Sequence, residues 1–234
     1  MKVSGVALAS AFLAALVLTM PTLRARAAER GDLVREVSFI EVRSDASERA
    51  AQILRAHARA LSGEIAAGHV WVLEEIGRPE RFALLESGER ARMLSTASQP
   101  ADPILTTLST VLVAPIDRRA NRDSPVVPLE VRAAPSEPGA VYAVAHVDIA
   151  PPVRSDIEQA FAEFARAARA SAGNLRFEAW QQTNRPNHFN LIGVWRARAD
   201  LDAFAASDAA RSFRASIAPL LGSLYDERVY RALE

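Results

Sequence analysis

The chain of 234 residues has no cysteine, and Lys2 is the only lysine among its basic residues. The absence of cysteine excludes a disulfide scaffold and any metal site built from thiolates. The sequence also lacks an excess of charge of either sign, because 28 basic residues balance 28 acidic ones. Proteins that bind nucleic acid through phosphate contacts need a basic excess, so we expect no nucleic-acid partner. With 50% of its residues hydrophobic, the chain is too apolar to be disordered.

The first residues have the pattern of a secretory signal. Lys2 precedes the apolar run Val3–Met20, Pro21 ends this run, and small residues at Ala25 and Ala27 match the cleavage rule. We therefore predict a signal peptide over residues 1–27, cleaved after Ala27, and export to the periplasm or the medium. An uncleaved anchor is the alternative, because the run is close to the shortest length that spans a bilayer. No later segment is long enough, so we expect no stable membrane insertion after cleavage.

Short motifs recur along the rest of the chain at a nearly constant offset. The segment Arg78–Phe82 (RPERF) recurs as Arg185–Phe189 (RPNHF), and Ala114–Ile116 (API) recurs as Ala218–Leu220 (APL). Matches in the same order at similar offsets predict an internal duplication. We place the first copy at residues 33–132 and the second at residues 140–234, with a linker rich in proline and alanine over residues 133–139.

The second copy alternates between strand and helix patterns. In Val141–Ile149, small apolar residues occupy one face while Tyr142 and His146 fall on the other, which predicts a half-buried strand. Further strands are predicted over Leu175–Gln182, Phe189–Trp195 and Leu224–Tyr230, with helices over Ser155–Ala172, Asp200–Ala206 and Ala209–Leu221. This order, β-α-β-β-α-β, is the ferredoxin-like motif.

The first copy is expected to follow the same order. We predict strands over Glu36–Arg43, Val70–Ile76, Phe82–Glu86 and Val126–Arg132, helices over Ser47–Ser62 and Pro103–Val113, and an exposed loop over Asn121–Ser124. A sheet covered by helices on one face leaves its other face bare, and two such sheets can bury these faces against each other. The predicted fold class is therefore α+β, with tandem ferredoxin-like repeats that form a pseudo-dimeric α/β barrel. The barrel interior is where a small ligand would fit.

The second copy resembles the antibiotic biosynthesis monooxygenase family. The shared residues are Gly173-x-Leu175-x-Phe177-Glu178, Pro186-Asn187-x-Phe189, Val194-Trp195, Leu201, Ser207 and Phe213. The resemblance covers residues 141–234, and the first copy joins it only through the repeat. It implies the dimeric α/β-barrel fold. Some members of the family oxygenate phenols or quinols without a cofactor, and others degrade haem.

The chain departs from the family pattern at two positions. A glutamate usually stands two residues before the family tryptophan, but Gly193 occupies that place here. The first copy keeps Glu86 at the equivalent place and has Gly88 where the tryptophan would be. A histidine usually follows the tryptophan by nine positions, where this chain has Phe204. This difference argues against haem degradation.

Oxygenation of a phenol without a cofactor requires a base, a few polar groups and aromatic walls around an apolar cavity. His146 faces the barrel interior by alternation and is the candidate catalytic base. The candidate substrate-binding residues lie on interior faces or carry the resemblance: Trp195, Trp180, Glu178, Tyr142, Asn190 and Trp71. His188, at a hairpin edge, is predicted to be solvated.

The four histidines do not stand at metal-ligand spacing, and no nucleotide-binding motif is present, so we predict neither a metal nor a cofactor. Three hypotheses follow. The first is an exported monooxygenase that acts on a small aromatic or quinol substrate with dioxygen. The second is a barrel that binds an apolar ligand or haem without turnover. The third is a structural or interaction role with a filled barrel. Association beyond the pseudo-dimer within the chain is left open.

Overall fold

The computed structural model describes residues 33–64, 69–89, 103–124, 127, 138–151 and 155–233. The predicted signal peptide, residues 1–27, lies outside these residues, as do most of the predicted strand Val126–Arg132 and most of the linker at 133–139. Among the described residues, no helix combines the length and the apolar character needed to cross a membrane.

Two halves of the chain follow the order β-α-β-β-α-β. The first half contains β1 (Leu33–Glu41), α2 (Ser47–Glu64), β2 (His69–Glu75), β3 (Arg78–Glu89), α4 (Pro103–Ser109) and β4 (Asp117–Asp123). The second contains β5 (Val141–Asp148), α5 (Ser155–Ala170), β6 (Asn174–Gln182), β7 (His188–Trp195), α6 (Arg198–Ala205), α7 (Asp208–Ile217) and β8 (Asp226–Ala232). Two short 3-10 helices, η2 (Ser44–Ala46) and η3 (Ala218–Leu220), complete the described elements.

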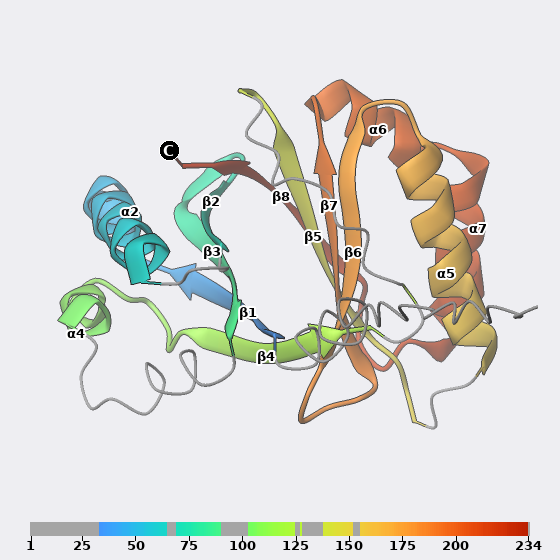
Figure 1. The fold of residues 1–234 in the computed structure, drawn as a ribbon, viewed down its shortest axis with the longest axis horizontal. Helices are drawn as coiled ribbons and strands as arrows, with labels where there is room; N and C mark the ends of the chain where they lie inside the picture. The colour runs from blue at the N-terminus through green and yellow to red at the C-terminus, as the bar shows by residue number, and fades with distance from the viewer. Residues whose placement is uncertain are drawn as a thin grey trace, which may run out of the picture. The chain divides into compact units, whose positions relative to one another are not determined.

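The eight strands close into one antiparallel barrel in the order β1-β3-β2-β8-β5-β7-β6-β4 (Figure 1). Each half contributes four neighbouring strands, and the barrel closes where the last strand of one half pairs with the second strand of the other. These junctions are the pairs β2–β8 and β4–β6. The predicted fold class, an α+β pseudo-dimeric barrel, is thereby confirmed.

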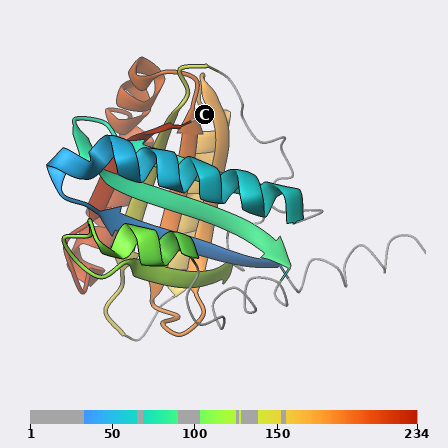
Figure 2. The ribbon, with the colours of Figure 1, turned by 90° about the vertical axis from the view of Figure 1, so that its left-hand side faces the viewer.

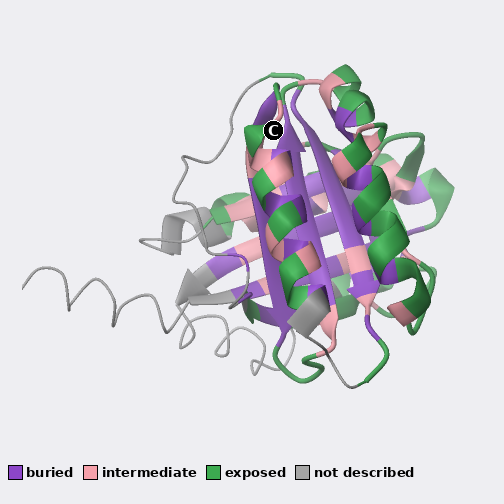
Figure 3. Cartoon of the chain, turned by 90° about the vertical axis from the view of Figure 1, so that its right-hand side faces the viewer, coloured by how far each residue is buried: buried purple, intermediate pink, exposed green. Residues whose placement is uncertain are grey.

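The helices cover the outside of the barrel in two groups. Helices α5, α6 and α7 lie on the strands of the second half, and α2 with α4 lies on those of the first (Figures 1 and 2). Figure 3 shows that the strands beneath α5 and α7 are buried, while the outward faces of these helices are exposed. This layering separates the apolar residues into one core inside the barrel and one core under each helix group.

Strand β5 is buried on both of its faces, and the prediction of a half-buried strand is wrong. Val141, Ala143 and Ala145 pack against the helices, whereas Tyr142 and Val144 face the barrel interior and are just as buried. Alternation therefore separates two cores here. Only His146 and Asp148, at the end of the strand, are partly exposed.

Strand β4 corrects the predicted end of the first half. The fourth strand that the structure describes in this half is Asp117–Asp123, ahead of the predicted segment, and the expected loop Asn121–Ser124 lies mostly within it. Asn121 and Ser124 are buried, 1% and 3% exposed. Arg119 and Asn121 have no apolar character, but they pair with Val37 and Arg35 of β1 and face the interior. Pairing with both β1 and β6 makes this charged segment a strand.

Candidate functional site

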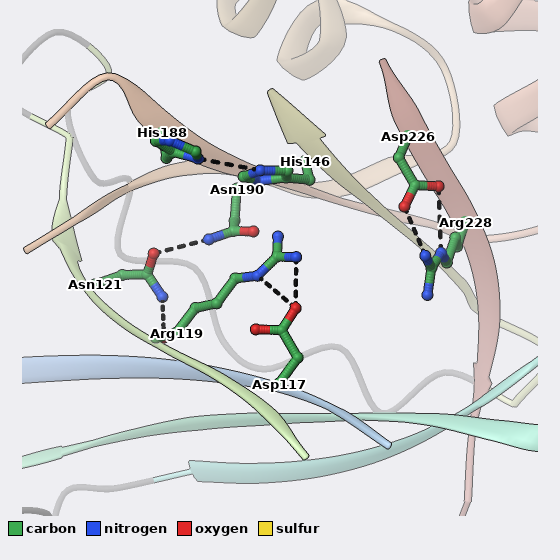
Figure 4. A network of polar contacts seen from close by, with 8 residues as sticks. All are labelled: Asp117, Arg119, Asn121, His146, His188, Asn190, Asp226 and Arg228. Carbon is green, nitrogen blue, oxygen red and sulfur yellow. Dashed lines mark hydrogen bonds and ion pairs between the residues drawn. The ribbon is translucent and has the colours of Figure 1, made fainter. Parts of the chain in front are cut away.

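The barrel interior combines an apolar middle with a polar end. The apolar side chains come from both halves: Val37, Leu73, Ala83, Leu85, Tyr142, Val144, Trp180, Ile192, Val194 and Tyr230. The polar end is formed by the residues of Figure 4: Asp117, Arg119, Asn121, His146, His188, Asn190, Asp226 and Arg228. Polar side chains grouped beside aromatic walls make this end the candidate site.

His146 occupies the centre of the polar end. It stands on β5 opposite Asn190 of β7 on one side and Asp226 of β8 on the other. Its Nε2 lies 3.3 Å from Nδ1 of His188, and its Nδ1 is buried without a hydrogen-bond partner among the described residues.

Burial lowers the pKa of His146 to about 4, and the positive charge of Arg119 adds to this effect. The neighbouring His188 acts in the same direction, whereas a hydrogen bond to the backbone of Phe189 and the negative charge of Asp148 raise the pKa and only partly oppose the decrease. His146 is therefore neutral near pH 7. A neutral imidazole with an unpaired nitrogen in the interior can accept a proton from a ligand.

Asn190 and Arg119 add two more unpaired atoms. Asn190 is fully buried, and its Nδ2 donates to Oδ1 of Asn121 at 2.8 Å, while its own Oδ1 has no partner among the described residues. Arg119 binds Oδ2 of Asp117 through Nε and Nη2, at 3.1 and 2.7 Å, and leaves its Nη1 buried and unpaired. Buried polar atoms are normally paired, so these three atoms at one end of the barrel are candidates to bind the polar group of a ligand. Figure 4 shows the three side chains side by side.

Two guanidinium groups frame the ring of Phe39 beside these atoms. Arg119 lies 4.8 Å and Arg228 lies 5.5 Å from the ring centre. Each arginine is paired with an aspartate two residues earlier on its strand, Asp117 or Asp226. The fixed positive groups thus stand over an aromatic surface at the polar end.

A second polar group lies deeper in the barrel. Glu178 is 3% exposed, and its Oε2 accepts hydrogen bonds from Nε1 of Trp180 at 2.9 Å and from Nη2 of Arg176 at 2.7 Å. The guanidinium of Arg176 lies 4.9 Å from the ring centre of Trp71. Glu178 therefore compensates the charge of Arg176 and orients the indole of Trp180. Tyr142 is buried in the same interior core, and burial raises the pKa of its phenol.

The interior thus brings together six of the seven residues selected from the sequence: His146, Asn190, Trp180, Glu178, Tyr142 and Trp71. It does not bring Trp195 to them. Trp195 lies in the core beneath the helices and stacks on Phe204 with ring centres 4.9 Å apart. A small cavity of about 20 Å³ beside Trp195 also belongs to this outer core.

The sequence reasoning missed Arg119, Asn121 and His188. His188 was expected to be solvated, but its side chain is only 14% exposed and contacts His146. Its two-residue spacing from Asn190, on the same face of one strand, was a usable signal. Arg119 lacked such a signal, because β4 has no apolar alternation. Among the described residues, no group of three or more histidine, aspartate or glutamate side chains is arranged to hold a metal ion.

In sequence comparison, residues 140–216 match the model of one family, described as antibiotic biosynthesis monooxygenase. This segment contains His146, Trp180, His188 and Asn190 but not Arg119. Among curated proteins, none matches the chain.

Solved structures share the fold over most of the chain. A candidate monooxygenase from Fusobacterium nucleatum matches with a TM-score of 0.72 and 9% identity, over 87% of this chain and 93% of that one. A candidate monooxygenase from Lactobacillus acidophilus matches with a TM-score of 0.64 and 11% identity, over 86% and 94% of the two chains. An anthrone oxidase-like protein has a TM-score of 0.64 and 8% identity, over 87% and 92%. At these identities the likeness establishes the fold alone.

Proposed function

We propose that this chain, whose residues 140–216 match the antibiotic biosynthesis monooxygenase model, oxygenates a small phenol or quinol inside its barrel without a metal or cofactor. The observation that carries the proposal is the group of three buried, unpaired polar atoms: Nδ1 of His146, Oδ1 of Asn190 and Nη1 of Arg119. One is a nitrogen that can act as a base, one is an acceptor and one is a cationic donor. A hydroxyl group on an aromatic ring can donate its one proton to Nδ1 of His146 and accept from Nη1 of Arg119, which leaves Oδ1 of Asn190 for a second donor on the ligand.

In the proposed reaction, the phenol donates its proton to Nδ1 of His146. The phenolate oxygen then accepts a hydrogen bond from Nη1 of Arg119. The charge of Arg119 lowers the pKa of His146. By the same electrostatic effect it lowers the pKa of a bound hydroxyl. The site therefore favours the phenolate, the form of the substrate that gives electrons to dioxygen.

The remaining steps balance without a co-reactant. Dioxygen takes one electron from the phenolate, and the two radicals combine at the ring carbon para to the oxygen. The peroxide takes the proton back from His146. The ring carbon then loses its hydrogen as a proton, and the O–O bond breaks with loss of water. Phenol and dioxygen become quinone and water, with all four electrons supplied by the substrate. The apolar side chains around Ile192 and Tyr230 keep bulk water from the anion.

A barrel that binds an aromatic ligand without oxidising it is the second candidate. The observation that favours it is the pKa of His146 at about 4, because a base this weak removes a phenol proton only with strong help from Arg119. Both candidates require a bound aromatic hydroxyl, and they differ in turnover.

Oxygen uptake separates these functions. The purified chain is given a panel of phenols, hydroquinones and anthrones, the last because one structural neighbour is anthrone oxidase-like. We expect uptake with at least one compound, and a loss of kcat/KM by at least about 100-fold in His146→Ala. His57→Ala is the matched control, since His57 lies on the outer helix α2 and contacts Glu86 of β3 rather than the polar end of the barrel. Binding without uptake supports the second candidate, and neither binding nor uptake excludes both.

We also propose that the chain is exported. The support is the sequence of residues 1–27, with its basic start, apolar run and cleavage pattern. The intact mass of the protein recovered from its native host tests this proposal. A mature chain that begins at Ala28 is expected, and a chain that keeps residues 1–27 contradicts cleavage.

A further inference from the structure

His146 is the first of three titratable side chains that stand in line from the barrel interior to its edge. Nε2 of His146 lies 3.3 Å from Nδ1 of His188, and Nε2 of His188 lies 3.4 Å from Oδ1 of Asp148. The two ring centres are 5.3 Å apart with planes 25° from each other. At this separation the near-parallel rings are offset from each other, and the distance between the two nitrogens fits an N–H···N hydrogen bond, drawn as a dashed line in Figure 4.

The carboxylate at the outer end is held in place. Asp148 Oδ1 accepts a hydrogen bond from Nδ2 of Asn187 at 3.2 Å, and the same Nδ2 also donates to the carbonyl of Ile149 at 2.9 Å. On the other side the chain passes so close at Gly222 that a Cβ there would lie 3.1 Å from Oδ2 of Asp148. Asp148 thus presents a fixed acceptor to His188.

The order of donors and acceptors favours one tautomer of each histidine. A carboxylate only accepts, so Nε2 of His188 carries the proton and its Nδ1 has the lone pair. Nδ1 of His188 therefore accepts from Nε2–H of His146. This leaves the lone pair of His146 on Nδ1, the buried atom that has no partner among the described residues.

We propose that His188 and Asp148 are positioning residues that hold the lone pair of His146 toward the barrel interior. Resting on the proposed function, this inference names two residues that complete its base. When Nδ1 of His146 takes the phenol proton, His146 becomes positively charged. The hydrogen bond from its Nε2 to Nδ1 of His188 and the negative charge of Asp148 stabilise this cation. No electron moves, and the proton returns to the peroxide from the same Nδ1.

Nuclear magnetic resonance tests the tautomer without any turnover. In ¹⁵N-labelled protein near pH 7, the ring nitrogens of His146 should show Nε2 protonated and Nδ1 unprotonated. In Asp148→Asn, an amide that donates to Nε2 of His188 would reverse the order and put the proton of His146 on Nδ1. The other charged groups facing the pair are Arg119 on β4, Arg185 before β7 and Asp226 on β8.

Asp226→Asn is the matched control. The carboxylate of Asp226 lies at the same level of the barrel, but it forms an ion pair with Arg228 and not with a histidine. Its removal should leave the tautomer of His146 unchanged. A proton on Nδ1 of His146 in the unsubstituted chain overturns the inference, whether or not the chain oxidises a phenol. An unchanged tautomer in both Asp148→Asn and His188→Ala also overturns it.

Kinetics provide the second measurement where a substrate of the panel is turned over. Asp148→Asn and His188→Ala should each lower kcat by about 100-fold or more and change KM less than about threefold, because neither side chain touches the substrate. The double variant should lose little more than either single variant, since the residues act as one unit. Additive losses, or losses confined to KM, contradict a positioning role. Absence of turnover alone counts against the proposed function and not against the tautomer.

Discussion

Arg119 shows how one side chain can set the chemistry of its neighbours. Its guanidinium is partly neutralised by Asp117 and lies over the ring of Phe39, yet it still lowers the pKa of His146. The nitrogen that remains unpaired, Nη1, is the group that a phenolate would contact. The same charge that makes His146 a weaker base therefore makes a bound hydroxyl a stronger acid.

Protonation of His146 should make stability depend on pH. Its pKa is about 4 in the folded chain and about 6.5 in an unfolded one, so the unfolded state binds more protons between these values. The free energy of unfolding should fall as pH drops from about 6.5 to 4, by roughly 1–2 kcal/mol after allowance for solvent screening.

Urea unfolding at pH 7 and pH 4.5, in the unsubstituted chain and in His146→Gln, measures this dependence. The variant should lose less stability between the two pH values. It will keep some dependence, because burial also lowers the pKa of His188. An equal loss in both proteins would show that His146 does not titrate as its surroundings require.

The interior residues that the sequence located all come from strands with clear alternation. His146, Trp180 and Asn190 each lie in a strand whose residues alternate between its two faces. The alternation therefore predicted that their side chains point into the barrel. The residues it missed depend on distant pairing. Arg119 points inward only because β4 pairs with β1 and β6, and the burial of His188 follows from its place opposite Asp148.

At the scale of elements, apolar periodicity located the strands and helices of the second half to within a few residues. The strand β4, with the sequence DRRANRD, was not predictable in this way. Its polar side chains are stabilised in part by partners that local patterns do not contain, such as Asn190, which donates to Asn121. Charged strands of this kind are specified by tertiary contacts rather than by local propensity.

Strand β7 and helix α6 are joined through Trp195, and this contact yields a second prediction. Trp195 is 1% exposed, stacks on Phe204, and has its Nε1 where a Cβ on Gly193 would be only 2.8 Å away. Because Gly193 has no Cβ, the indole of Trp195 can occupy the space beside it. We expect Trp195→Phe to lower the free energy of unfolding by about 1–3 kcal/mol, because it leaves a cavity in the outer core.

The same variant should leave ligand binding in the barrel unchanged, since Trp195 faces the helices and not His146. Denaturant unfolding together with KM for an oxidised phenol checks both parts. A large change in KM with unchanged stability would place Trp195 in the site instead.

At the scale of the whole molecule, the two halves offer corresponding positions to one interior. Asp117 and Asp226 begin the last strands of the two halves, and each precedes by two residues an arginine that lies over Phe39. Asp117 pairs with Phe39, whereas Asp226 pairs with His146. Opposite these residues stand Ala83 in the first half and Asn190 in the second. The polar group therefore occurs once, and its counterpart is apolar.

This asymmetry predicts one ligand site per chain rather than two. 4-Nitrophenol is a suitable probe, because its phenolate absorbs visible light and its ring resists oxidation. A titration of the chain with this probe at a pH below the pKa of free 4-nitrophenol should reach one bound phenolate per chain, since His146, Asn190 and Arg119 form one group of unpaired atoms for the oxygen, and Phe39 and Ala83 stand at the corresponding positions of the other half. His146→Ala should abolish phenolate formation, while Arg198→Ala on the exposed surface of α6 should not change it. Two equivalent bound phenolates per chain would show that the position around Phe39 and Ala83 also accepts a hydroxyl, and that the polar residues of the second half do not define the site.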